Sequence, residues 1–222
     1  MQLYIYRIII IIIIILILFI IQIYFGNWFA HQRNCNDIYN QTPIYTKHKI
    51  LRGFLTKEQC KLIIQEAGLY GEKRGWTTER HDNYPTTDNE ITKEWSCYSF
   101  LKNKIESQLY LEYVKLFKIN KDKLKIDEIF IAKYDGNNYK AQNSLDEHTD
   151  GSEFSFIIAL NDDYTGGGTN FKKKKQNIKL SAGDVVVFCG QTIHAGLPVT
   201  NGVRYIIPGF LSYGKCLQQF VM

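Results

Sequence analysis

Two histidines and one aspartate form the pattern with the clearest chemical meaning in this sequence. His148 and Asp150 lie two residues apart, and His194 follows further along the chain. On an extended segment, side chains two residues apart point to the same side, so His148 and Asp150 can share one metal ion. Two imidazoles and one carboxylate are the ligands that hold non-haem Fe(II) on one face and leave its other positions open. We therefore predict that His148, Asp150 and His194 bind iron, with His194 supplied by another strand.

A permanent cation follows this pattern, because Arg204 comes shortly after His194. Its guanidinium group is a planar fork of hydrogen-bond donors that suits a carboxylate. A lone His-x-Asp is weak evidence for a metal site. The same pattern with a distant histidine and then a basic residue, all in sequence typical of strands, is much stronger. The set predicts iron chemistry with an acidic cosubstrate bound by Arg204.

The segments that must position these side chains are typical of β-strands. Short runs rich in β-branched and aromatic residues, separated by Gly, Asn and Asp clusters, begin after Lys118. They cover residues 126–134, 154–160, 177–180, 184–189 and 203–213. The order of helices followed by many short strands predicts a mainly β (α+β) fold, a double-stranded β-helix or jelly roll with N-terminal helices packed on one sheet.

Two helical patterns precede these strands. Thr56 and Gln59 have the form of a capping box, which predicts a helix that ends at Gly68 or Gly71. An apolar stripe over residues 92–117 predicts a second helix, and that stripe is typical of core packing.

The N-terminal segment differs from the rest of the chain. From Ile8 to Phe25 the residues are apolar except for Gln22, and a run of this length can span a bilayer as a helix. A soluble helix needs a polar face, which this run lacks. A cleaved signal peptide is the alternative, although its apolar region would be unusually long. The sequence predicts a single transmembrane helix over residues 8–25, whose orientation the flanking basic residues do not decide.

Length and composition bound the remainder. The 222 residues have a net charge of +5, with 45% hydrophobic and 14% aromatic residues, which excludes a disordered chain. The charge is modest and spread out, so nucleic acid is not expected as a partner. We predict a membrane anchor at residues 1–33, a linker at 34–49 and one globular domain at 50–222. The five cysteines show no metal-type pairing, and they permit an oxidising compartment without requiring one.

Five segments of the C-terminal half carry a family resemblance. They are residues 148–150 (HTD), 158–161 (IALN), 163–171 (DYTGGGTNF), 182–184 (AGD) and 194–205 (HAGLPVTNGVRY). In these segments and their order the chain resembles the Fe(II)/2-oxoglutarate dioxygenases, specifically the branch of prolyl 4-hydroxylases and procollagen-lysyl hydroxylases. The resemblance covers roughly residues 50–213 and is most specific from Tyr134 onward.

This resemblance implies a role for each site residue. The iron ligands are the same triad, and Arg204 stands where the family places the basic residue that pairs with the distal carboxylate of 2-oxoglutarate. Tyr134 is carried over as a further cosubstrate contact, with Tyr139 as the second choice. Prolyl hydroxylases of the collagen type usually have Lys at the position of Arg204, whereas lysyl hydroxylases and oxygen-sensing prolyl hydroxylases have Arg. The choice between Pro and Lys as target therefore stays open.

The family also implies an activity. A membrane-anchored dioxygenase would convert 2-oxoglutarate to succinate and CO2 and hydroxylate a peptidyl prolyl or lysyl side chain. The implied cofactors are Fe(II), 2-oxoglutarate and L-ascorbate, the implied partner is a protein or peptide substrate, and the implied location is the endoplasmic reticulum with a lumenal catalytic domain. Two alternatives remain: a catalytically silent, membrane-anchored binding module of the same fold, and a dioxygenase acting on a small molecule. A zinc hydrolase with these ligands is disfavoured, since it has no use for Arg204.

Two further features have a plain interpretation beside a functional one. His81, in a turn-rich stretch, is either an ordinary surface residue or part of a substrate groove. The run from Lys172 to Lys175 is predicted to be a solvated hairpin tip, with attraction of acidic substrates or lipid headgroups as the alternative.

Overall fold

The computed structural model describes residues 12–23, 46–81, 84–138 and 140–214. The chain divides into two units, residues 1–42 and 43–222. In the first unit residues 12–23 are helical, and they are the described part of the run predicted to span a membrane; the rest of that run lies outside the described residues. Among the residues that the structure describes, no helix combines the length and the apolar character needed to cross a membrane.

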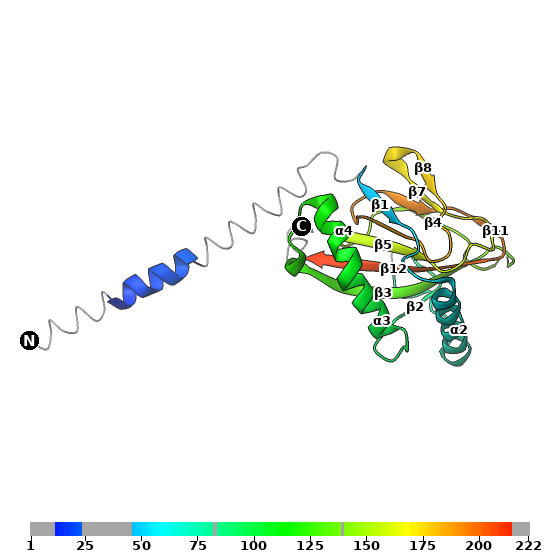
Figure 1. Cartoon of the computed structure of the whole chain (residues 1–222), viewed down its shortest axis with the longest axis horizontal. Helices are drawn as coiled ribbons and strands as arrows, with labels where there is room; N and C mark the ends of the chain where they lie inside the picture. The colour runs from blue at the N-terminus through cyan, green and yellow to red at the C-terminus, as the bar shows by residue number, and fades with distance from the viewer. Residues whose placement is uncertain (1–11, 24–45, 82–83, 139, 215–222) are drawn as a thin grey trace, which may run out of the picture. The chain divides into compact units, whose positions relative to one another are not determined.

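Two antiparallel sheets form the body of the second unit (Figure 1). The larger sheet has the strand order β1 (His48–Leu51), β9 (Val185–Cys189), β5 (Phe154–Ala159), β12 (Val203–Tyr213), β3 (Leu124–Asp135) and β2 (Asp88–Glu90). The smaller sheet has the order β4 (Leu145–His148), β10 (His194–Gly196), β7 (Thr169–Phe171) and β8 (Gln176–Ile178). A separate two-stranded sheet pairs β11 (Val199–Asn201) with β6 (Thr165–Gly166). This mainly β core with helices matches the prediction and is consistent with a jelly roll.

The hydrophobic core contains side chains from the larger sheet and from the smaller one. The central strands β5 and β9 are buried along their whole length, which explains why both read as continuous apolar runs in the sequence. Phe130 from β3, Phe171 from β7 and Phe188 from β9 belong to one buried cluster, with the rings of Phe171 and Phe188 5.1 Å apart. The two sheets are thereby held face to face, which fixes the strands that carry the predicted metal ligands.

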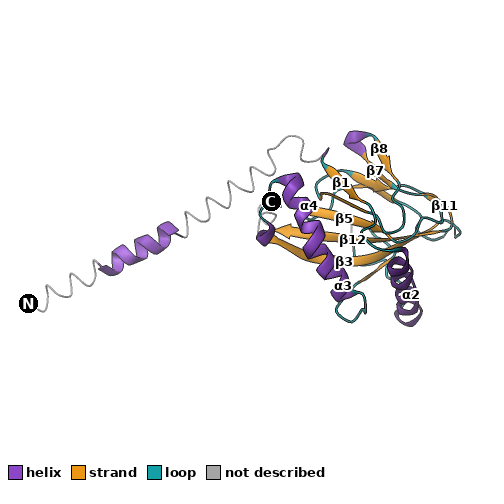
Figure 2. Ribbon diagram, in the orientation of Figure 1, coloured by secondary structure: helices purple, strands orange, loops and turns teal. Residues whose placement is uncertain are grey.

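Helices pack against the large sheet, as predicted (Figure 2). They are α2 (Lys57–Arg74), α3 (Tyr98–Lys104), the π-helical stretch η2 (Ile105–Leu109) and α4 (Tyr110–Phe117); short 3-10 turns occur at η3 (Lys121–Lys123) and η4 (Lys172–Lys174). The hydroxyl of Tyr113 donates to the backbone oxygen of Ser155 at 2.7 Å, and the rings of Phe117 and Phe154 lie 4.9 Å apart. The second helix was predicted to start near residue 92, but residues 93–97 form turns and the helix starts at Tyr98.

The first helix starts where the sequence predicts and ends later. Thr56 caps α2 in a capping box with Gln59. The predicted end at Gly68 or Gly71 is wrong, because the helix continues to Arg74 and is followed by Gly75 at φ 84°. Gly71 serves packing instead, since a Cβ atom there would lie 2.2 Å from Nε1 of Trp76. A glycine near the end of a helical pattern predicts the end of the helix, and the local sequence does not show that the indole ring of Trp76 packs against Gly71.

Replacing these two glycines with alanine is expected to change the free energy of unfolding in opposite directions. Gly68→Ala should raise the free energy of unfolding by about 0.5–1 kcal/mol, since nothing lies within 4 Å of its added Cβ and alanine favours the helix. Gly71→Ala should lower it by roughly 1–2 kcal/mol through overpacking against Trp76. Urea unfolding of the two variants checks this, and a shift of both in the same direction would contradict the packing role of Gly71.

Three smaller predictions can be compared with the structure. The run Lys172 to Lys175 is a hairpin tip between β7 and β8, as predicted. Strand β1 includes the last two residues of the segment predicted as a linker. Cys189 is buried in the core, as predicted, and burial raises the pKa of its thiol to about 11. Cys60 and Cys97 are likewise buried free thiols, whereas Cys35 and Cys216 lie outside the described residues.

Candidate metal centre

The three predicted metal ligands meet at one place between the strands of the smaller sheet. His148 is the last residue of β4 and His194 the first residue of β10, and the two are direct partners in the antiparallel register. Asp150 lies just beyond β4, where its backbone N–H donates to the oxygen of Gly190 at 2.8 Å. Gln191 also donates to the backbone oxygen of Asp150 at 3.1 Å. The backbone of Asp150 is thus fixed independently of its carboxylate.

The ligand atoms of these three side chains all lie within 4.8 Å of one another. The Nε2 atoms of His148 and His194 are 3.5 Å and 3.8 Å from Oδ1 of Asp150. Nδ1 of His148 lies 2.8 Å from the backbone oxygen of Asp146, and Nδ1 of His194 lies 2.9 Å from that of Thr192. A carbonyl oxygen only accepts, so each Nδ1 carries a hydrogen, and the neutral form of each imidazole has its lone pair on Nε2, the ring nitrogen nearest the carboxylate.

Electrostatics within the cluster suit a cation. Burial favours the neutral form of Asp150, but attraction to His194 and hydrogen bonds from His148 and Ser155 hold the pKa of its carboxyl below the ordinary value. Burial lowers the pKa of His194, so its imidazole is neutral at neutral pH. Burial also lowers the pKa of His148, but its hydrogen bonds to Asp150 and Asp146 outweigh this and raise it. The cluster therefore presents a carboxylate between two imidazoles that are oriented before any metal arrives.

Arg204 lines the same cavity, is buried, and forms no ion pair with an acidic side chain of the described residues. It is 4% exposed, and its two terminal nitrogens donate to the backbone oxygen of Gly168 at 3.0 Å and to Oγ1 of Thr169 at 3.3 Å. Its Nε atom is buried and has no hydrogen-bond partner among the described residues. A buried cation without a carboxylate is costly. The observation fits a site that receives an anionic ligand.

Tyr134 stands beside this cation. It is 3% exposed and pairs with Arg204 across strands β3 and β12, and the guanidinium carbon lies 5.6 Å from the centre of its ring. Burial outweighs the nearby cation and raises the pKa of Tyr134 to about 12. The phenol is therefore a neutral donor at neutral pH. Tyr139, the second choice from the sequence, lies outside the described residues.

A cavity of about 580 Å³ joins the triad to Arg204 and opens toward the surface. The buried pair Arg204 and Tyr134 lies at one end, and the partly exposed His81 and Phe210 line it as well. His81 thus belongs to the cavity wall, which was one of its two interpretations. This volume is in the range of pockets that hold small organic ligands, and it leaves room for a cosubstrate and the tip of a side chain.

Sequence reasoning missed three residues that line this cavity. Thr169, which accepts from Arg204, lies in the glycine-rich segment but was not singled out. Arg80 and Tyr84 line the cavity as well, and the rings of Tyr84 and His148 lie 4.9 Å apart. Thr169 could have been found from its place after three glycines. No local signal marks Arg80 or Tyr84, since only the fold brings them to the triad.

The donor set fits Fe(II). Two oriented imidazoles and one carboxylate leave the opposite positions of a metal open. The buried guanidinium of Arg204, whose Nε has no partner among the described residues, and the neutral phenol of Tyr134 suit a dicarboxylic cosubstrate.

Comparison with known proteins supports this fit. Residues 131–212 match the 2OG-Fe(II) oxygenase superfamily. The chain is 29% identical over 197 residues to procollagen-lysine,2-oxoglutarate 5-dioxygenase 1 of Rattus norvegicus, a match that covers 80% of this chain and 24% of the relative. It is 27% identical over 197 residues to the procollagen lysyl hydroxylase and glycosyltransferase of Acanthamoeba polyphaga mimivirus, covering 83% of this chain and 20% of the relative. The chain thus spans about a fifth to a quarter of the length of these relatives.

Solved structures share the fold. A Pseudomonas putida prolyl-4-hydroxylase superimposes with a TM-score of 0.59 at 17% identity, covering 74% of this chain and 91% of that one. A prolyl hydroxylase of Trichoplax adhaerens, solved in complex with a peptide fragment of the hypoxia inducible factor oxygen degradation domain, superimposes with a TM-score of 0.61 at 14% identity. That match covers 89% of this chain and 97% of the other. The family resemblance seen in the sequence is confirmed.

Proposed function

We propose that this chain, which carries a 2OG-Fe(II) oxygenase domain homologous to procollagen-lysyl and prolyl hydroxylases, is an Fe(II)- and 2-oxoglutarate-dependent hydroxylase of peptidyl prolyl or lysyl side chains. One observation carries the proposal. The triad lines the same cavity as a buried arginine, Arg204, which forms no ion pair with the described residues. A metal site alone would suit many activities, whereas a metal site combined with a buried receptor for a carboxylate suits a keto-acid cosubstrate.

Each residue has a defined task in this proposal. His148, Asp150 and His194 hold the iron, with both imidazoles locked through Nδ1. Arg204 binds the distal carboxylate of 2-oxoglutarate through its guanidinium group, whose Nε has no partner among the described residues. Tyr134 donates its phenolic hydrogen to the same ligand, because its raised pKa keeps it protonated. When bound, iron and cosubstrate would supply the oxidation with O2 as the oxidant: one oxygen atom would enter the succinate that forms with CO2 from 2-oxoglutarate, and the other would enter a C–H bond.

The cavity wall supports a peptide side chain as the target. Phe130, Pro208 and Phe210 give the part of the cavity away from Arg204 an apolar lining, which excludes water from the reacting C–H bond and positions it. Arg204 itself does not separate prolyl from lysyl hydroxylation. The family resemblance adds ascorbate as the reductant that rescues iron after unproductive turnovers, and we include it in the proposal.

The domain plan also belongs to this proposal. We propose the anchor at residues 1–33, the linker at 34–49 and the dioxygenase domain at 50–222, with the catalytic domain in the endoplasmic reticulum lumen. The run from Ile8 to Phe25, which is apolar except for Gln22, supports the anchor. Extraction of membranes with alkaline carbonate tests it, and release of the full chain into the soluble fraction would contradict it.

The substrate proposal is tested by incubating the full chain with Fe(II), 2-oxoglutarate, ascorbate and a panel of Pro-rich and Lys-containing peptides. We expect succinate formation that rises with peptide, and a peptide that gains one oxygen atom on a prolyl or lysyl residue by tandem mass spectrometry. Succinate without any modified peptide would leave the oxygenase and point to a small-molecule substrate. No succinate from iron-loaded protein would refute the enzyme and favour the silent binding module.

A further inference from the structure

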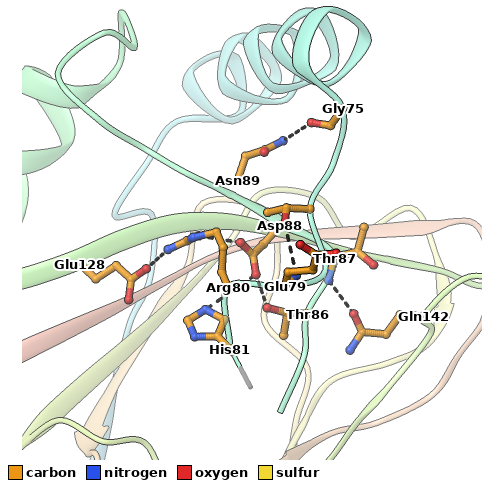
Figure 3. A network of polar contacts seen from close by, with 11 residues as sticks. Gly75, Glu79, Arg80, His81, Thr86, Thr87, Asp88, Asn89, Glu128 and Gln142 are labelled. Carbon is orange, nitrogen blue, oxygen red and sulfur yellow. Dashed lines mark hydrogen bonds and ion pairs between the residues drawn. The ribbon is translucent and has the colours of Figure 1, made fainter. Parts of the chain in front are cut away.

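A polar cluster that includes Arg80, His81, Asp88 and Glu128 lies at the wall of the cavity (Figure 3), and its His81 is near enough to His148 and Asp150 for their charges to act on it. Arg80 and His81 line the cavity there. Glu128 lies on β3 on the same face as Phe130, which also lines the cavity, because residues two apart in a strand share a face. On the neighbouring strand β12, Phe210 is the direct partner of Glu128. The cluster therefore adjoins the region that a peptide must cross to reach the metal.

A fully buried carboxylate organises this cluster. Asp88 is 0% exposed, and its Oδ1 atom accepts a hydrogen bond from Nη1 of Arg80 at 2.5 Å. Its other oxygen, Oδ2, accepts from the hydroxyl of Thr86. The second terminal nitrogen of Arg80 forms an ion pair with Glu128, and the guanidinium lies 5.2 Å from the centre of the Phe130 ring. Arg80 is thus held on two sides and over one face, so its orientation is fixed before any ligand binds.

The backbone beside Asp88 is clamped as well. The side-chain amide of Gln142 accepts from the N–H of Thr87 at 2.7 Å and donates to the backbone oxygen of Pro85 at 2.8 Å. This pair of bonds replaces those that a neighbouring strand would make. These bonds of Gln142 connect the segment that precedes β2 to the segment that leads into β4 and its metal ligand His148.

The charges of the cluster do not cancel. Among the described side chains of the cluster, one cation, Arg80, pairs with two carboxylates, Asp88 and Glu128, so these three groups carry one net negative charge. His81 is the other titratable group against Asp88, with Nε2 3.7 Å from Oδ2. Burial lowers the pKa of His81 more than Asp88 raises it, so His81 is neutral at neutral pH. An acidic group entering here meets repulsion, although Arg80 is present.

Arg80 still has hydrogen bonds to give. A guanidinium carries five N–H groups, and the contacts with Asp88 and Glu128 use one from each terminal nitrogen. Because the charge of Arg80 is already compensated, the acceptor that suits the remaining donors is neutral. A peptide backbone carbonyl is such a group.

We propose that Arg80 and Glu128 are specificity-determining residues: Arg80 donates to a backbone carbonyl of the peptide substrate, and the uncompensated charge of Glu128 disfavours acidic residues beside the hydroxylated side chain. Asp88 is the positioning residue that holds Arg80. The substrate class is then a peptide whose target residue has neutral or basic neighbours. This inference rests on the proposed function, since it assumes that a peptide enters the cavity.

The test compares two fluorescein-labelled peptides that share one Pro and one Lys in a Gly and Ala background. In the second peptide Asp replaces the residues flanking each of them. Binding to the full chain is followed by fluorescence anisotropy, which needs no turnover, and succinate formation is measured in parallel. Glu128→Gln removes the charge and keeps the shape. Asp127→Asn is the matched control, because Asp127 is the exposed neighbour of Glu128 on β3 and its carboxylate accepts from the hydroxyl of Ser212 at 2.7 Å, whereas that of Glu128 pairs with Arg80.

We expect the unmodified chain to bind the neutral-flank peptide roughly threefold to fivefold more tightly than the Asp-flanked one, the effect of a partly exposed charge. Glu128→Gln should bring the ratio close to one, Asp127→Asn should keep it, and added salt should reduce it. Arg80→Ala should weaken binding of both peptides. Equal binding of both peptides, no binding of either, or an unchanged ratio in Glu128→Gln would overturn the inference. Binding with the expected ratio but no succinate would refute the proposed activity and leave the charge selection standing.

Discussion

Replacing Asp150 or His194 with alanine is expected to abolish both Fe(II) binding and 2-oxoglutarate turnover while the domain stays folded. Each side chain supplies one of the three ligands that the described residues offer to this site. We expect turnover to fall by at least ~100-fold, since loss of residues that merely orient metal ligands already costs 10- to 100-fold. The stability effect should be small, because the backbone bonds of Asp150 to Gly190 and Gln191 persist without its carboxylate.

Metal binding by isothermal titration calorimetry, turnover by succinate release and unfolding by circular dichroism together check this expectation. His48→Ala is the control, because His48 packs on Phe171 at 5.2 Å in strand β1 and does not line the cavity. This variant should bind metal like the unmodified chain. If Asp150→Ala or His194→Ala kept full iron-dependent turnover, the assignment of the metal centre would be wrong.

Replacing Arg204 with alanine is expected to raise the KM for 2-oxoglutarate by roughly 30-fold or more. The basis is that losing one partner of a buried charged hydrogen bond costs about 2–5 kcal/mol, and each 1.4 kcal/mol is about tenfold. The terminal nitrogens of Arg204 donate to Gly168 and Thr169 and not to the metal ligands. Metal affinity in the absence of cosubstrate should therefore change little.

Two variants sharpen this prediction. Arg204→Lys keeps the positive charge and loses the planar fork, so its KM should lie between those of the unmodified chain and the alanine variant. Arg52→Ala is the control, because Arg52 pairs with Asp184 through a side chain that is 66% exposed, away from the cavity. Initial rates over a range of 2-oxoglutarate concentrations separate the cases. An unchanged dependence on 2-oxoglutarate in Arg204→Ala would exclude Arg204 as the carboxylate receptor.

The features that sequence reasoning predicted well are those set by local chemistry. The capping box at Thr56 depends on residues three apart, and strands β5, β9 and β12 are marked by their own apolar or β-branched residues. His148 and Asp150 are visible as a pair because both contribute to one site from neighbouring positions. In each case the cause and the effect lie within a few residues of each other.

The features that it missed depend on contacts between distant segments. Strands β4 and β10 are short and polar, and they exist because each finds a partner across the sheet. The helix α2 passes through Gly71 because the ring of Trp76 packs there. Arg80 reaches the cavity only because Asp88 is buried beneath it and Glu128 comes from another strand. The spacing of residues in the sequence does not predict these contacts between distant segments.

The most direct measurement of the central claim is an oxygen-isotope experiment with the full chain. The protein is incubated under ¹⁸O₂ with Fe(II), 2-oxoglutarate, ascorbate and the peptide that gives the highest succinate yield, and both products are analysed by mass spectrometry. We expect one ¹⁸O atom to enter succinate and one to enter a prolyl or lysyl residue of the peptide, and neither to appear with Asp150→Ala. Succinate free of ¹⁸O, or product oxygen that comes from water from the start of the reaction, would contradict a dioxygenase at this site.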